Sequence, residues 1–201
     1  MGAHRRSLHA SVIAAALIAF STAIGAAEQG GVNGHVSDIR IDNFGRINAN
    51  YFRGAQPGGR DYSDLAALGV KTVIDLTADG DVQEPDIVKG VGMKFFRIPM
   101  TTRVAPSAAQ VAQFLKLVND PANQPVYVHC QGGRHRTGVM TAVYRMTKEG
   151  WAADRAFSEM KSYRFGPDFL HPEFKSFVYA FRSAPTLEAS SDTVVAASAV
   201  K

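Results

Sequence analysis

Apolar and polar positions along residues 43–182 change period several times, and the changes predict strands and helices in alternation. An apolar run predicts a buried strand at 125–128. Further strands are predicted at 70–76 and 93–98, and at 51–57, where a strand ends at a Gly/Pro turn. Apolar residues at helical spacing predict helices over 61–68, 85–89, 107–118, 136–146, 153–163 and 172–181. Ile39 and Ile41 alternate with charged residues, which predicts a short edge strand at these two positions.

This alternation predicts a single α/β domain over residues 43–182, with a largely parallel central sheet flanked by helices. In such sheets ligands bind beyond the carboxyl ends of the strands, so we expect the functional site there. The last helix has an aromatic stripe at helical spacing, which predicts a core-facing side made of Phe174, Phe177, Val178 and Phe181.

The two ends of the chain differ from this pattern. Arg5 and Arg6 precede an apolar, Ala-rich run, and the small residues Gly25-Ala26-Ala27 follow it. This order predicts a secretory signal peptide over residues 1–27, and hence an exported protein, periplasmic or secreted. An uncleaved anchor is the alternative, but the run is short for a span, so we expect no stable membrane span after cleavage. Residues 28–42 are interpreted as a leader with the edge strand, and 183–201 as a disordered tail.

Charge and cysteine content narrow the possible functions. The formal charge of +4 is small for 201 residues, and we expect no nucleic-acid partner. Cys130 is the single cysteine, so it has no partner in the chain for a disulfide. The six histidines are scattered and no metal-ligand spacing stands out, so we expect no metal and no cofactor.

The stretch from Val126 to Gly138 combines the residues that phosphate chemistry needs. A short apolar strand ends at Cys130, two glycines follow, and a helical pattern begins near Arg136. Paired glycines let the backbone turn tightly with N–H groups pointing inward, and the helix N-terminus adds its positive end. The same positive field favours a thiolate at Cys130, which is a nucleophile aimed at phosphorus. We therefore predict a phosphate nest made of Gln131, Gly132, Gly133, Arg134, His135 and Arg136.

The order His129-Cys130, five intervening residues, then Arg136-Thr137-Gly138 resembles the signature loop of the cysteine-dependent protein tyrosine and dual-specificity phosphatases. The segment 51–57 (Tyr-Phe-Arg-Gly-Ala-Gln-Pro) is similar to the strand that opens atypical dual-specificity phosphatases. This resemblance covers roughly Phe44 to Phe181 and implies the fold predicted above.

The resemblance also implies a mechanism and assigns roles to the loop. Cys130 attacks phosphorus to form a phosphocysteine, and water then hydrolyses it. Arg136 and the loop amides hold the phosphoryl oxygens, with a bidentate fork from the guanidinium. We expect Thr137 to hydrogen-bond the departing thiolate. His129 is expected to orient the loop through backbone contacts, because the matching histidine of the family is not a proton donor.

The general acid of the family has no obvious counterpart. The family takes an aspartate from the loop that here spans Pro99–Pro106, and its slot falls at Thr102, which cannot protonate a leaving oxygen at neutral pH. The general acid therefore stays unknown from the sequence. The carboxylates in other loops that remain open as substitutes are Asp79, Asp81, Glu84 and Asp168.

The substrate is expected to be a phosphorylated protein or a small phosphorylated molecule. The ending of the loop, residues 133–138, resembles that of plant and fungal atypical phosphatases, several of which prefer inositol pyrophosphates. An inositol polyphosphate, inositol pyrophosphate or phosphoinositide phosphatase is therefore an alternative to a phosphotyrosine or dual-specificity phosphatase. Two further hypotheses are a rhodanese-like sulfurtransferase and a catalytically weak phosphate-binding module, the latter motivated by Thr102.

Overall fold

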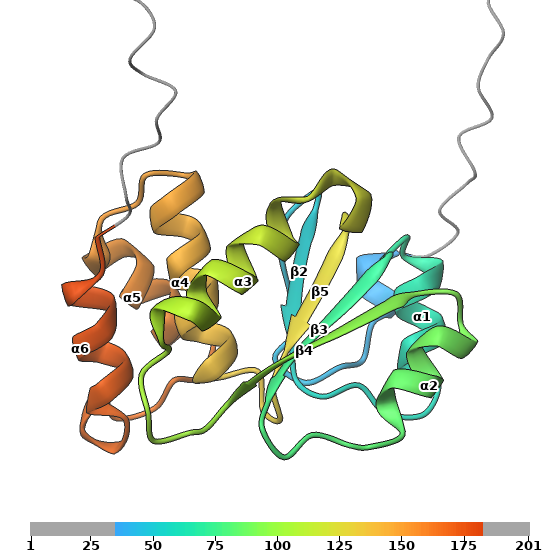
Figure 1. Ribbon diagram of the computed structural model, residues 1–201, viewed down its shortest axis with the longest axis horizontal. Coiled ribbons are helices and arrows are strands. Elements are labelled where there is room, and N and C mark those ends of the chain that lie inside the picture. The colour runs from blue at the N-terminus through green and yellow to red at the C-terminus, as the bar shows by residue number, and fades with distance from the viewer. Residues whose placement is uncertain (1–34, 183–201) are drawn as a thin grey trace, which may run out of the picture. The chain divides into compact units, whose positions relative to one another are not determined.

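The computed structural model describes residues 35–182; the predicted signal peptide (1–27), most of the leader and the predicted C-terminal tail (183–201) lie outside the described residues. One sheet runs through this domain (Figure 1). Its strands, in spatial order, are β1 (Gly45–Asn48), β2 (Tyr51–Gly54), β5 (Val126–His129), β3 (Thr72–Thr77) and β4 (Lys94–Met100). Only β1 is antiparallel to its neighbour, and the remaining pairs are parallel.

Helices cover both faces of the sheet (Figure 1). One face packs against α1 (Asp61–Ala67) and α2 (Glu84–Gly90). The other packs against α3 (Ala108–Asn119), α4 (Arg136–Lys148), α5 (Ala153–Ser162) and α6 (Pro172–Ala180). Short 3-10 turns occupy Val36–Asp38, Pro121–Asn123 and Asp168–Leu170. The mixed α/β domain with a mostly parallel sheet confirms the predicted fold class.

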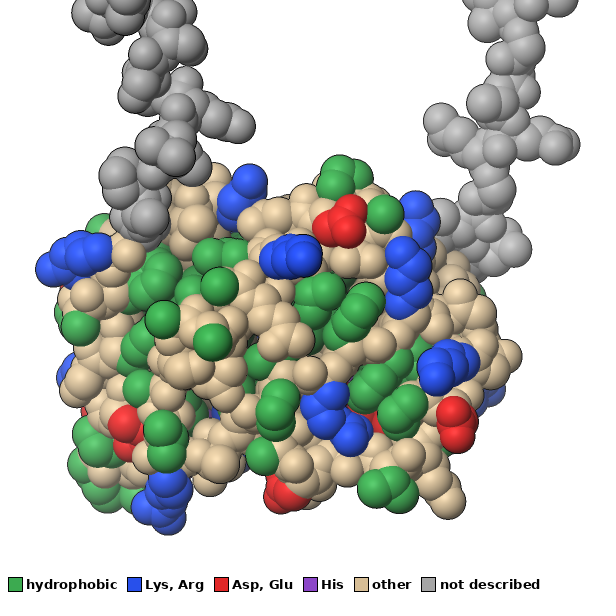
Figure 2. All heavy atoms as spheres, viewed as in Figure 1, with side chains coloured by type: hydrophobic (Ala, Val, Ile, Leu, Met, Phe, Trp, Pro, Cys, Tyr) green, Lys and Arg blue, Asp and Glu red, His purple; other side chains and the backbone are tan. Residues whose placement is uncertain are grey.

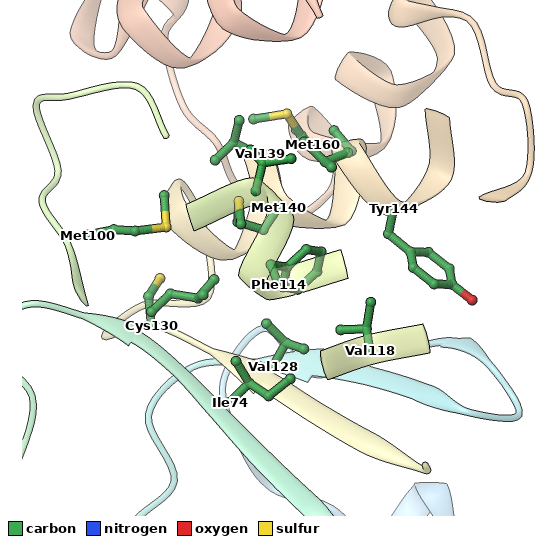
Figure 3. Close-up of a cluster of buried hydrophobic side chains, with 14 of the residues drawn as sticks. Ile74, Met100, Phe114, Val118, Val128, Cys130, Val139, Met140, Tyr144 and Met160 are labelled. Atoms are coloured by element: carbon green, nitrogen blue, oxygen red, sulfur yellow. The ribbon is translucent and has the colours of Figure 1, made fainter. Parts of the chain in front are cut away.

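The larger of two hydrophobic clusters lies between the sheet and α3 to α6 (Figure 3). Phe114 of α3, Val128 of β5 and Val139 of α4 are fully buried in it, which fixes α4 over the middle of the sheet. Cys130 belongs to this cluster, and Figure 3 shows it on the same side as Met100, where β5 and β4 end. The thiol therefore lies where the core meets the carboxyl end of the sheet.

Helix α3 begins where the sequence predicts, because Ser107 caps it. The Ser107 hydroxyl accepts a hydrogen bond from the backbone N–H of Gln110 at 3.2 Å, and the Gln110 side chain accepts one from the Ser107 N–H at 2.8 Å. The Gln110 amide also donates to the Pro99 carbonyl at 2.6 Å. The cap thus ties the start of α3 to the loop that follows β4.

Two expectations from the sequence differ from the structure. The edge strand predicted at Ile39 and Ile41 is wrong, because the chain there forms no strand and the sheet edge is β1. Ile41 is buried in the smaller cluster, and Asn43 adopts a positive φ of 58° that ends any extended run. In the stripe of α6, Phe174 and Val178 are buried, while Phe177 and Phe181 are partly buried.

Charged groups are mixed on the face of the domain that Figure 2 draws. On the face drawn in Figure 2, the Lys and Arg side chains of the described residues lie among acidic and apolar ones and are not gathered into one stripe. Within residues 35–182, no helix combines the length and the hydropathy that crossing a membrane requires.

Candidate active site

The loop from Cys130 to His135 joins the central strand β5 to α4, and its shape depends on Gly133. This glycine has a φ of +63°, which favours glycine. A Cβ atom placed there would lie 2.5 Å from the backbone carbonyl of Gly54, at the end of β2. The loop is also tied to that strand's extension, because the Gln56 N–H donates to the Gln131 carbonyl at 3.1 Å. The close approach of two backbones thus requires glycine at position 133.

Two side chains donate hydrogen bonds to the carbonyl of Gly133. Arg53 of β2, fully buried, donates to it through Nη2, and Asn43 donates to it through Nδ2 at 2.9 Å. The Asn43 amide also donates to the carbonyl of Tyr163 at 2.8 Å, and the Arg53 guanidinium lies 3.9 Å from the centre of the Tyr163 ring. With the carbonyl turned outward to these donors, the N–H groups of the loop are free to face the nest.

Arg53 also supplies a buried positive charge close to the nucleophile. Burial lowers the pKa of Arg53, while the electrostatic effects of Tyr51, Tyr163 and Cys130 act in the opposite direction. A guanidinium has an ordinary pKa of about 12.5 or more and is effectively always protonated in proteins. Arg53 thus acts as an internal hydrogen-bonding post for the loop.

Arg136, the first residue of α4, extends across the mouth of the nest. Its Nη1 donates to the carbonyl of Met100 at 3.2 Å, and its side chain is only 6 % exposed. The buried Nε has no hydrogen-bond partner among residues 35–182. The guanidinium also lines a cavity of about 430 Å³ together with Ala78, Asp79, Met100, Thr101, Thr102 and Gln131. A buried donor without a partner, next to an open cavity, is suited to an anionic ligand.

Thr137 and His129 are both fully buried on either side of the loop. The Thr137 hydroxyl has no hydrogen-bond partner in the described part of the chain, so its predicted bond to the sulfur stays a prediction. The His129 side chain points away from the nest, with Nε2 2.9 Å from Glu84 Oε1 and Nδ1 3.9 Å from Asp75 Oδ1. Its side chain contacts carboxylates, and the orienting of the loop through backbone contacts that the sequence predicted stays a prediction.

The remaining loop side chains differ in their surroundings. Gln131 and Arg134 are exposed. His135 packs its ring 3.7 Å from the centre of the His171 ring, and its Nε2 lies 2.9 Å from the carbonyl oxygen of Phe165. Burial lowers the pKa of His135, and the charges of His171, Arg134 and Arg136 act in the same direction, so its ring adds no positive charge to the nest at neutral pH.

Of the four carboxylates left open by the sequence, the structure brings Asp79 to Arg136, with Oδ1 3.7 Å from Nη1. Asp81 accepts a hydrogen bond from the N–H of Gln83, and Asp168 pairs with Lys161 and Lys175. Thr102 lines the same cavity as Arg136, and its carbonyl oxygen lies 3.1 Å from His171 Nδ1.

Glu84 belongs instead to a buried ionic network that sequence reasoning missed. Ligand atoms of Asp75, Glu84 and His129 lie within 4.8 Å of one another. Arg97 closes the network, with Nε 2.6 Å from Asp75 Oδ2 and Nη2 3.6 Å from Glu84. Burial acts to raise the pKa of Glu84, but contact with His129 and its charge outweigh burial and leave that pKa below its ordinary value. A guanidinium already neutralises these carboxylates, so we interpret the cluster as an ion-pair network and not as a metal site.

The thiol, the paired glycines and the arginine of one strand–loop–helix unit, on a mostly parallel sheet, define the class of cysteine-dependent phosphatases. The model of the family described as DSP-PTPase phosphatase fused to NAD+ kinase matches residues 38–175, and the chain belongs to this family. The resemblance to cysteine-dependent tyrosine and dual-specificity phosphatases is thereby confirmed.

Individual relatives fit the same class. The chain is 27 % identical over 133 residues to inositol diphosphatase SIW14 of Saccharomyces cerevisiae, covering 63 % of this chain and 47 % of that protein. It is 28 % identical over 130 residues to dual specificity protein phosphatase TpbA of Pseudomonas aeruginosa, covering 63 % and 56 %. The chain thus spans about half the length of these relatives. The crystal structure of TpbA superimposes with a TM-score of 0.60 at 26 % identity, over 70 % of this chain and 86 % of that one.

Proposed function

We infer that this chain hydrolyses phosphate monoesters through a phosphocysteine intermediate formed on Cys130. The observation that carries the proposal is the position of this buried thiol, at the end of β5 and beneath a loop whose Gly133 carbonyl is turned outward by Arg53 and Asn43. Arg136, with an unpartnered buried Nε, supplies the anion-binding fork beside it.

The reaction proceeds in two displacements. In the first, the Cys130 thiolate attacks phosphorus in line, an S–P bond forms, and the P–O bond to the leaving group breaks with its electron pair going to that oxygen. Arg136 and the loop amides hold the equatorial oxygens, where negative charge concentrates. In the second, water attacks phosphorus, the S–P bond breaks, and inorganic phosphate and the thiolate are released.

Two substrate classes are supported by different observations. TpbA is named a dual specificity protein phosphatase and has been solved in complex with phosphotyrosine, which favours phosphotyrosine or dual-specificity substrates. SIW14 is named an inositol diphosphatase, and the exposed Arg134 on the rim of the nest suits a highly phosphorylated ligand, which favours inositol pyrophosphates as the second candidate. Turnover of phosphotyrosine peptides, phosphoserine peptides, phosphoinositides and inositol pyrophosphates, measured side by side, separates these classes.

Substitution of the nucleophile tests the chemistry. Cys130→Ser is expected to abolish turnover while the melting temperature stays close to that of wild type, because a hydroxyl is not ionised at neutral pH. Rapid quenching of the wild type with a radiolabelled substrate should trap a phosphothiol that the variant lacks. Retention of more than a few per cent of turnover would show that Cys130 is not the nucleophile. Phosphate binding by an inactive wild type would favour a binding module, and sulfur transfer from thiosulfate would favour a sulfurtransferase.

We also propose that the protein is exported and acts in the periplasm or outside the cell. The proposal rests on Arg5, Arg6, the apolar run and Gly25-Ala26-Ala27 in the sequence. N-terminal sequencing of protein recovered from outside the cytoplasm is expected to begin near Glu28. Recovery of an intact N-terminus in the soluble cytoplasmic fraction would reject export.

A further inference from the structure

Resting on the phosphatase activity inferred above, we propose that Asp79 is the general acid that protonates the leaving group. In the loop after β4, Thr102 has no group that can donate a proton at neutral pH, although it lines the cavity next to Arg136. Asp79 lines the same cavity from the loop between β3 and α2, and its Oδ1 lies 3.7 Å from Arg136 Nη1. A carboxyl at this distance from the phosphate-binding fork lies close to where the leaving oxygen of a bound phosphate departs.

Backbone hydrogen bonds between the ends of β3 and β4 fix the position of Asp79. Thr77, at the end of β3, pairs with Met100 at the end of β4. The next N–H, that of Ala78, donates to the Met100 carbonyl at 3.1 Å, and Arg136 Nη1 donates to the same oxygen at 3.2 Å. The Met100 carbonyl thus accepts hydrogen bonds both from the residue before Asp79 and from the Arg136 guanidinium. These shared bonds fix the distance between the Asp79 loop and the guanidinium.

The ionic network of Asp75, Glu84, His129 and Arg97 also holds the loop that carries Asp79. Arg97 donates through Nε to Asp75 at 2.6 Å and through Nη2 to the carbonyl of Asp81 at 2.7 Å. Gly80 packs so closely on this network that a Cβ atom would collide with Asp75, Thr77 and Arg97. Asp79 therefore lies between Ala78, whose N–H is bonded to Met100, and the closely packed Gly80. Both neighbours limit how far the loop can move from the nest.

Other acidic groups in residues 35–182 are less suitable. The Asp81 carboxylate is turned to the N–H of Gln83, 2.8 Å away, at the start of α2. Glu84 is fully buried and its pKa is lowered by His129, so it carries no proton to give at neutral pH. Asp168 is held by Lys161 and Lys175, and hydrogen bonds from these lysines lower its pKa. Asp79 is 83 % exposed, so a bulky leaving group can reach it.

The proton balance of the two steps is as follows. The mechanism requires that Asp79 holds its proton when the substrate is bound. As the P–O bond breaks, the leaving oxygen takes the electron pair and accepts the Asp79 proton, and an alcohol departs. In the second step the Asp79 carboxylate accepts a proton from the water that attacks the phosphocysteine. The carboxyl is thereby restored as the S–P bond breaks and Cys130 leaves as a thiolate.

The test compares Asp79→Asn with Asp81→Asn, a matched change two residues along the same loop. For Asp79→Asn we expect turnover of alkyl phosphates such as phosphoserine to fall by about 10²- to 10⁴-fold, the loss typical of a missing acid. Aryl phosphates with good leaving groups should lose much less, and the alkaline limb of the pH–rate profile should disappear. Asp81→Asn should keep the wild-type profile.

A second variant separates proton donation from other roles of the carboxylate. Asp79→Asn combined with Thr102→Asp restores a carboxyl in the same cavity, and partial recovery of alkyl phosphate turnover with an alkaline limb is expected. If Asp79→Asn instead turns over every substrate as fast as wild type or faster, the carboxylate only competes with phosphate for Arg136 and the proposal is wrong. Activity that survives Cys130→Ser would reject the covalent mechanism itself, and an inactive wild type would reject both inferences.

Discussion

Substitution of Gly133 by alanine measures how strictly the phosphate loop depends on its backbone. Two effects add at this position. The φ of +63° is expected to cost an L-residue about 1 to 2 kcal/mol. The new Cβ atom would also lie 2.5 Å from the carbonyl carbon and oxygen of Gly54 and 2.7 Å from the nitrogen of Ala55. Carbon contacts are optimal at about 3.5 to 4.0 Å, so the two backbones must separate by about 1 Å.

This separation sets the expected magnitudes. Overpacking of this kind costs about 1 to 3 kcal/mol, so Gly133→Ala should lower the free energy of unfolding by about 2 to 5 kcal/mol in total. A displacement of about 1 Å in a group that positions the substrate can reduce the rate by about 10²-fold. The loop amides are such groups, so we expect kcat to fall at least that much in the folded fraction.

Gly150→Ala provides the control, because Gly150 has nearly the same φ, +66°, and no atom within 4 Å of the added Cβ. It lies between α4 and α5 and should lose only the backbone term, about 1 to 2 kcal/mol, with turnover unchanged. Urea unfolding and initial rates with an aryl phosphate measure both quantities for each variant. Equal losses of stability in the two variants, with full turnover in Gly133→Ala, would refute the close backbone approach described here.

Two further predictions concern the charged groups of the loop. Arg136→Lys should reduce kcat/KM by about 10²- to 10³-fold in steady-state assays, because a point charge cannot replace the bidentate fork; a loss below tenfold would contradict this role. Burial and the neighbouring charges lower the pKa of His135, so the unfolded chain binds more protons and stability is lost as pH falls through about 6.5. His135→Gln should therefore show a smaller drop in melting temperature between about pH 7 and pH 5 than wild type, and an equal drop would contradict it.

The strand, loop and helix around Cys130 could be predicted because their signals are local. The apolar run before Cys130, the glycines and the helical spacing after Arg136 are all adjacent in sequence, and the structure forms β5 and α4 within two residues of the predicted bounds. The short alternation at Ile39 and Ile41 misled the prediction, since Ile41 is buried against helices and strands without joining the sheet. Two isoleucines cannot tell strand periodicity from simple burial.

The supporting residues of the site depend on strand order, which one sequence does not reveal. Arg53 reaches Gly133 because β2 lies next to β5, and Asp75 lies level with His129 because β3 lies on its other side. Nothing in the sequence pattern marked Asn43 or Arg97 as part of the site. Asparagine is, however, a residue type that tolerates the positive φ seen at position 43. Spacing along the chain located the empty acid slot at Thr102, and only the strand order brings Asp79 to the same cavity.

The same strand order explains how a proton donor could lie on a different loop from the expected one. The loops after β3, β5 and β4 all leave the carboxyl edge of one parallel sheet, so the loops after β3 and β4 both reach the nest that follows β5. A donor in the loop after β3 lies next to Arg136, and in the free protein its carboxylate partly neutralises the positive charge that attracts phosphate. Asp79 should therefore weaken phosphate binding while it promotes leaving-group departure. Removing its charge should lower KM and kcat together, a combination that loss of a purely structural contact does not produce.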